Sequence, residues 1–215
     1  MRLLGIGFGR GTQPVNAISP CPTHGRRFRV DAALAHLVAE DYLSQRCAPH
    51  DPVIATAYRQ LGEQADRWFA LLTSPGRGVR VVFTADPDPY LDAEELRESV
   101  RSDRILELHS AANDRHRRHP LFDAARGGSL DRFRAVHDIV SHAWGGHAFD
   151  RDGEYSAWRA ERRLYRGMAA AALATELHAH HSVRWTTGEV APYRAVLIAP
   201  HLVRASLRAG HVEGS

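Results

Sequence analysis

Apolar side chains recur every three or four residues through two long segments, and this spacing limits the possible folds more than any other feature of the chain. The first segment runs from Asp31, a residue suited to capping a helix, to about Arg46. The second begins at Pro52, a proline at a first helical position, and ends before a turn at 74–78. Its apolar positions are Ile54, Tyr58, Leu61, Ala65, Trp68, Phe69 and Leu72. Each segment predicts an amphipathic helix that buries one face.

The rest of the chain alternates helical patterns with two short strand patterns. Strands are predicted over 79–84 and 105–108. Further helices are predicted from Asp92 to about 101, from a Ser129 cap to about Gly145, from an Asp152 cap through 153 to about 181, and over 201–208. Gly167 is the weak point of the long helix over 153–181. The fold class expected is α+β, mainly α-helical with a small β-sheet and a helical core of the kind that holds metal sites.

Length and composition predict one folded unit. The chain has 215 residues, of which 44% are hydrophobic and 25% charged, values ordinary for a globular protein. We expect an extended segment over 1–30, rich in Gly, Pro and Arg, and a single mainly helical domain over 31–215 with a catalytic core over about 129–199. The sequence shows neither an apolar run long enough for a bilayer nor a signal peptide, so we expect a cytoplasmic protein.

The charged residues favour a small anionic partner over a nucleic acid. All 28 basic residues are arginines, and most of them are mixed with acidic residues along the chain. Binding to nucleic acid requires basic residues gathered on one face of a recognisable module, which argues against that partner. Arginine forks suit a carboxylate, sulfate or phosphate on a small molecule. The two cysteines, Cys21 and Cys47, read as free thiols, and the sequence leaves homo- or hetero-oligomerisation open.

Histidines and acids in the second half of the chain form a pattern suited to a divalent metal. His137 and His142 share one predicted helix, and Glu176 follows on the next. Two imidazoles and one carboxylate on one side of an ion leave open positions for oxygen and substrate, as in non-haem iron enzymes. On an ideal helix His137 and His142 point about 140° apart. They can therefore converge only if the helix bends or ends between them.

Other polar residues of this region are candidates for catalysis. Asp138 and Glu154 could orient the metal ligands or move protons, and Arg134 or Arg184 could hold a substrate carboxylate. His147, in the loop after the helix, is a further catalytic candidate.

The order of these residues resembles the iron-binding core of the aromatic amino acid hydroxylases. The resemblance rests on His137-Asp138-Ile139-Val140-Ser141-His142, Phe149, Ala174-Thr175-Glu176-Leu177 and the 188–198 stretch, and it covers about 133–199. It implies that His137, His142 and Glu176 bind Fe(II). The chain departs from that family at Ser141, where the family has glycine, and at Tyr193-Arg194, where it has tyrosine-glycine. No counterpart of the family's pterin segment precedes His137, which argues against a pterin cofactor.

A second resemblance, over most of 50–199, is to a group of small actinobacterial and phage proteins of unassigned activity. It rests on His119-Pro120-Leu121, Phe133-Arg134-Ala135-Val136-His137-Asp138, Gly153-Glu154 with Ala157-Trp158, and Ala174-Thr175-Glu176.

Three functions stay open from the sequence. The first is a mononuclear non-haem iron oxygenase that acts on an amino acid or related small metabolite. The second is a metal-free tailoring enzyme of specialised metabolism, which carries out an elimination, cyclisation or transfer on an anionic intermediate with histidine or carboxylate as base. The third is a binding or phage-related protein without catalysis.

Overall fold

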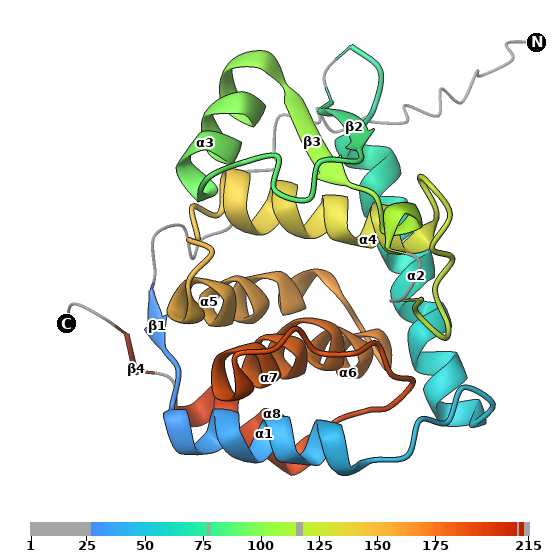
Figure 1. Ribbon diagram of the computed structural model, residues 1–215, viewed down its shortest axis with the longest axis vertical. Helices are drawn as coiled ribbons and strands as arrows, with labels where there is room; N and C mark the ends of the chain where they lie inside the picture. Colours follow the sequence, from blue (N-terminus) through green and yellow to red (C-terminus); the bar gives the residue numbers. More distant parts are fainter. Residues whose placement is uncertain (1–26, 77, 115–117, 210, 213–215) are drawn as a thin grey trace, which may run out of the picture.

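A stack of helices carries a small sheet at one end in the computed structural model, which describes residues 27–76, 78–114, 118–209 and 211–212. Figure 1 shows β2, β3 and α3 at the top, then α4, α5 and the α6–α7 pair, with α1 and α8 at the bottom and α2 along one side. This arrangement confirms the mainly α-helical α+β class. Most of the segment 1–30 lies outside the described residues.

The two long N-terminal helices form where the apolar spacing predicts them. Helix α1 spans Ala32–Ser44 and begins where the Asp31 side chain accepts a hydrogen bond from the Leu34 amide. Helix α2 spans Pro52–Leu72 and is capped by Asp51. Their apolar faces meet the later helices, because α2 packs on α4 and α6 while α1 packs on α7 and α8. Helix α8, Pro200–Ala209, confirms the predicted terminal helix.

The strands form two separate pairs. Strands β2 (Arg80–Thr84) and β3 (Ile105–His109) are parallel, with Arg80 opposite Ile105. Helix α3 (Ala93–Glu98) and a wider π-helical turn (Ser99–Asp103) connect them. Strand β1 (Phe28–Arg29) pairs antiparallel with β4 (His211–Val212), and a short 3-10 turn (Ala111–Asn113) follows β3.

One helix of the second half widens abruptly in mid-course. Helix α4 spans Ser129–His137 and continues without a break as the π-helix η4, Asp138–Trp144. Gly128 stands at the N-cap position, so the prediction of a Ser129 cap is wrong; the Ser129 hydroxyl instead accepts a hydrogen bond from the Asp123 amide. The helix ends at Gly145, as predicted.

The single long helix predicted over 153–181 is wrong, because the chain breaks at Gly167. Helix α5 covers Arg151–Glu161, and a 3-10 turn (Arg162–Leu164) follows it. Gly167 then adopts a left-handed φ of 64°, which a residue with a side chain adopts only at a cost. The chain turns and resumes as α6 (Ala169–Leu173), the π-helix η6 (Ala174–Ala179) and α7 (His180–Thr187). This turn lets α5 pack against η6 and α7.

The cap of α5 also differs from the prediction. Asp150 caps the helix by accepting a hydrogen bond from the Gly153 amide. Asp152, the predicted cap, instead accepts one from the Val30 amide and so ties α5 to the segment after β1.

Two apolar clusters surround the centre of the stack. The larger joins α1, α2, α5 and α6 around the fully buried Trp158, and the smaller joins the β2–β3 sheet to the inner face of α4 and η4 through Leu106 and Ile139. Helix α5 contacts the π-helices η4 and η6. Within the described part of the chain, no helix combines the length and the apolar character needed to cross a membrane.

Candidate metal centre

The change of winding after His137 brings two histidines together. In a π-helix the backbone bonds join residues five apart, as the Gly145 amide does with the Val140 carbonyl. Residues five apart therefore approach the same face, and His142 Nε2 lies 3.0 Å from His137 Nε2. The two rings stand nearly perpendicular, at 86°. The sequence predicts that the helix must bend or end between the two histidines for them to converge; the helix instead continues through both, and its wider π-helical winding brings them together.

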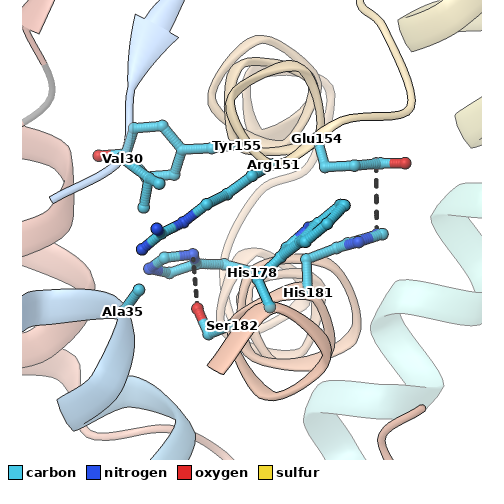
Figure 2. A pocket seen from close by; sticks show the side chains of 9 residues that line it. Val30, Ala35, Arg151, Glu154, Tyr155, His178, His181 and Ser182 are labelled. Carbon is cyan, nitrogen blue, oxygen red and sulfur yellow. Dashed lines mark hydrogen bonds and ion pairs between the residues drawn. The ribbon is translucent and has the colours of Figure 1, made fainter. Parts of the chain in front are cut away.

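Glu154 of α5 completes a triangle with these two histidines. Its Oε2 atom lies 3.4 Å from His137 Nε2 and 3.6 Å from His142 Nε2. We call these three atoms the metal triangle. His181 of α7 flanks it, because its Nε2 atom lies 3.3 Å from Glu154 Oε2. Figure 2 shows Glu154 and His181 pointing toward one another from their two helices.

Hydrogen bonds on the far side of each ring assign the tautomers of the two histidines. His142 Nδ1 lies 2.8 Å from the His147 carbonyl oxygen, which only accepts, so Nδ1 carries a hydrogen. His137 Nδ1 lies 2.6 Å from Glu161 Oε2, which also accepts a hydrogen bond from the Ser141 hydroxyl at 2.9 Å. In the neutral rings both Nε2 atoms therefore present lone pairs to the centre of the metal triangle.

With both rings neutral, the three atoms of the metal triangle are acceptors that converge in a buried place, an arrangement that could hold a cation. Glu154 Oε2 is buried and accepts no hydrogen bond of good geometry among the described residues, which is costly without a compensating charge. Metal bonds of about 2.1 Å separate adjacent ligand atoms by about 3.0 Å in octahedral and about 3.4 Å in tetrahedral geometry. The edges of the metal triangle, 3.0, 3.4 and 3.6 Å, match these separations.

Asp138 adds a further carboxylate beside the pair. Its oxygen and the ring nitrogens of His137 and His142 lie within 4.8 Å of one another, a spacing that could hold a metal ion. Burial raises the pKa of Asp138, against the lowering effect of the two histidines and Arg134. This carboxyl group therefore keeps its proton to a higher pH than an exposed aspartate.

The charges of the metal triangle oppose one another in sign. Burial alone would lower the pKa of His137, but the negative charges of Glu161 and Glu154 raise it well above the ordinary value. Burial would raise the pKa of Glu154, but the charges of His181 and His142 hold it well below. Burial lowers the pKa of His181 to about 4, against the raising effect of Glu154.

A cleft of about 520 Å³ opens beside the metal triangle. His137, Asp138 and His181 form its wall on that side. Arg134 and Arg184, the two arginines proposed from the sequence to hold a carboxylate, also line it. Arg134 donates a hydrogen bond to the His109 carbonyl, whereas Arg184 is exposed. The apolar lining residues are Ala111, Leu130, Phe133, Leu177, Val190 and Ala191.

A much smaller cavity lies on the other side of Glu154. Its volume of about 10 Å³ suits a single water molecule. Figure 2 shows Arg151 extending into it between Tyr155 and His178, and the Arg151 Nε atom is buried without a hydrogen-bond partner among the described residues.

Glu176 does not join the metal triangle. Its Oε1 atom accepts hydrogen bonds from the Tyr58 hydroxyl at 2.7 Å and from His119 Nε2 at 3.2 Å. Across the described ranges, no ion pair links Glu176 with His137 or His142. The structure therefore replaces Glu176 with Glu154 as the carboxylate nearest both histidines, and Glu176 stands in the wall of the cleft.

His147 enters the site through its main chain. Its carbonyl oxygen accepts the hydrogen bond from His142 Nδ1, and its imidazole is buried. This hydrogen bond orients the His142 ring, so that its Nε2 atom faces the other two atoms of the metal triangle.

Sequence reasoning missed Glu161 and His181. Glu154 and Glu161 are seven residues, or two helical turns, apart on α5, so both side chains lie on the same face of the helix. The two positions are about 10 Å apart along the helix axis, and the His137 ring lies between their carboxylates. That spacing was a usable signal for Glu161. No local signal marks His181, because its position depends on how α7 packs against α5. His119, a partner of Glu176, entered only through a resemblance.

Comparison with known proteins adds no relative: no family model, curated protein or solved structure matches the chain.

Proposed function

We propose that the protein is a mononuclear non-haem iron oxygenase that acts on an amino acid or a related small metabolite. His137, His142 and Glu154 would hold the ion as a set of two histidines and one carboxylate, the donor set typical of non-haem Fe(II) oxygenases. Three converging lone-pair atoms in a buried place, with both Nδ1 atoms engaged elsewhere, carry this proposal. Fe(II) held in this way supplies oxidation with dioxygen as oxidant and an organic substrate as reductant.

The residues around the metal triangle have separate roles in this proposal. Glu161 and the His147 carbonyl orient the two rings and keep their Nε2 atoms free for the ion. Asp138, at the cleft wall next to His137, can hold a proton and donate it to the substrate. Arg184 and Arg134 can bind a substrate carboxylate at the same cleft.

The metal content of the wild type and three variants tests the proposal. Wild type, His142→Ala, Glu154→Gln and Glu176→Gln are purified without a His-tag or chelator, loaded anaerobically with Fe(II) and measured by mass spectrometry. About one iron per chain is expected in wild type and in Glu176→Gln, and less than a tenth of that in the other two. Wild type without iron above background contradicts the metal centre. Iron retained by Glu154→Gln but lost by Glu176→Gln contradicts the ligand set.

The identity of the metal tests the reaction class separately. A set of two histidines and one glutamate also suits a hydrolytic zinc ion. Zinc retained against a tenfold excess of Fe(II), with no oxygen consumption on any metabolite tested, would overturn the oxygenase while leaving the metal site intact.

One observation favours a metal-free enzyme as the second candidate. Glu161 and His137 form a carboxylate–imidazole pair, and His137 lines the cleft, an arrangement suited to a general base oriented by an acid. Arginines of the cleft would then hold an anionic intermediate. Absence of metal in wild type, together with turnover of an anionic metabolite that survives exhaustive chelation, is the outcome that supports it.

A further inference from the structure

The two carboxylate oxygens of Glu176 have different surroundings. Oε1 accepts two hydrogen bonds, from Tyr58 and His119. Oε2 lies 3.9 Å from His180 Nε2, which is too long for a hydrogen bond. The side chain is only 2% exposed, yet it lines the cleft. The hydrogen bonds that Glu176 accepts from described residues thus both end on Oε1 and leave Oε2 to the cleft.

Neither of the two neighbouring histidines, His119 and His180, directs a ring N–H at Glu176 Oε2. His119 Nδ1 accepts hydrogen bonds from the amides of Leu121 and Phe122, so its hydrogen is on Nε2 and is directed to Glu176 Oε1. Both ring nitrogens of His119 are therefore engaged, and the ring is not available as a metal ligand.

The Nε2 hydrogen of His180 has a different acceptor. The Tyr42 hydroxyl donates to the Pro192 carbonyl, so its oxygen accepts from His180 Nε2 at 2.9 Å. The hydrogen of His180 Nε2 is directed at Tyr42 and away from Glu176.

Glu176 keeps its negative charge in this place. Burial would raise its pKa, but His180, His119 and the Tyr58 hydrogen bond lower it to about 2. The Tyr193 ring lines the same cleft and lies 5.1 Å from the ring of His119 and 5.3 Å from that of His180, centre to centre. A carboxylate and an aromatic ring in one cleft can both attract an ammonium group.

We propose that Glu176 Oε2 binds the ammonium group of a zwitterionic substrate of the amino-acid type, whose carboxylate is held by Arg184 or Arg134 of the same cleft. This subsite rests on the proposed function, because it takes the cleft as the substrate site of the metal centre. The apolar wall, with Phe133 and Leu177 among its residues, would then receive the side chain of the amino acid.

Two other acids of the cleft, Asp138 and Asp88, are less suited to this role. Asp138 adjoins the metal triangle, and burial raises its pKa, which favours its neutral form. Asp88 is exposed, so water screens its charge. Asp88 thereby offers a matched control: a carboxylate of the same cleft whose removal should leave ammonium recognition intact.

Binding of the twenty protein amino acids to the iron-loaded, anaerobic full-length protein is measured by calorimetry. The tightest binder is then compared with the same molecule lacking its amino group. Wild type and Asp88→Asn should bind the amino acid at least tenfold more tightly than the analogue. Glu176→Gln keeps an acceptor for Tyr58 and His119 but places an amide where Oε2 stood, and it should bind both ligands equally.

The outcomes separate this subsite from the metal centre. Binding of none of the twenty, equal binding of the amino acid and its analogue by wild type, or an unchanged preference in Glu176→Gln overturns the subsite, whatever the iron content. Loss of the preference in Glu176→Gln at one iron per chain supports it. If wild type binds no metal and still binds the amino acid more tightly than the analogue, that outcome supports the subsite and contradicts the proposed function. If Glu176→Gln fails to fold, the wild-type comparison still tests the subsite, because equal binding of the amino acid and its analogue overturns it.

Discussion

Glu161 Oε2 lies 2.6 Å from His137 Nδ1, and no part of the Glu161 side chain is exposed. The carboxylate thus holds the ring from the side opposite the metal triangle. A buried partner at this distance keeps the hydrogen on Nδ1 and makes Nε2 the better donor to an ion.

Glu161→Gln tests this relationship. The amide of glutamine can still accept the Nδ1 hydrogen through its oxygen, but the negative charge is lost. We expect metal affinity to fall by about 10- to 100-fold, the effect typical of a lost partner behind a ligand, without abolition of binding. Competition with a chelator of known affinity measures the change. An affinity equal to wild type would show that Glu161 serves packing alone.

Ser141→Ala provides a milder test of the same pair. The Ser141 hydroxyl donates to the oxygen of Glu161 that faces His137, at 2.9 Å. Because Glu161 keeps its bond to His137, we expect a decrease in metal affinity of less than about tenfold, in keeping with roughly 1 kcal/mol for one hydrogen bond. The same chelator competition applies, and a loss as large as that of Glu161→Gln contradicts this ranking.

Metal binding should stabilise the folded protein, because the ligands come together only in the fold. Free Fe(II) at about 100 times its dissociation constant adds about 2.7 kcal/mol, which corresponds to a rise of about 5 to 10 °C in the melting temperature. Anaerobic scanning calorimetry with and without Fe(II) measures the rise. His142→Ala is the control, and an equal rise in that variant would mean that the ion binds elsewhere.

Acid should destabilise the protein through His178. Burial, followed by the charges of His181 and Arg159, lowers the pKa of His178 to about 3. The ring stacks on Trp158 at 4.3 Å and contacts the Ser206 hydroxyl at 2.9 Å. The unfolded chain takes up a proton near pH 6.5 and the folded one only near pH 3, so stability decreases as the pH falls through this window, on the order of a few kcal/mol.

His178→Phe keeps the stacking and removes the titration. Urea unfolding of wild type and variant at several pH values from 7 to 4 measures the difference. The variant should lose less stability than wild type over this range. Parallel curves would contradict a neutral, buried His178.

Gly167→Ala tests the break between α5 and α6. Its φ of 64° is strained for alanine, and a Cβ there would lie 3.2 Å from Gln60 Oε1. We expect a loss of about 1 to 2 kcal/mol. Gly62→Ala is the matched control, because Gly62 lies inside α2 with its nearest neighbour, Phe122, at an ordinary 3.4 Å. Urea unfolding should show the control unchanged or more stable, and equal effects at both positions would rule out backbone strain at Gly167.

Much of the helical framework could be predicted from local patterns. The capping Asp31, Pro52 at the start of α2 and the spacing of Tyr58, Leu61 and Ala65 act within a few residues of themselves, so they specify α1 and α2 without knowledge of the rest. The sequence also predicts that His137 and His142 cannot converge on an ideal α-helix, which would point them about 140° apart. It does not predict that π-helical winding removes this separation.

The choice of the third carboxylate depended on tertiary structure. Glu154 and Glu176 are both acids on helices near the histidine pair in sequence, and both are buried. The loop over 145–150 folds α5 against η4, and the left-handed turn at Gly167 folds η6 against α5. This packing directs Glu154 to His137 and His142, and Glu176 to Tyr58 and His119. Residue types and their spacing determined that a cluster of histidines and acids would form. Which acid lies opposite which imidazole depends on contacts between segments far apart in the chain, and no local pattern encodes those contacts.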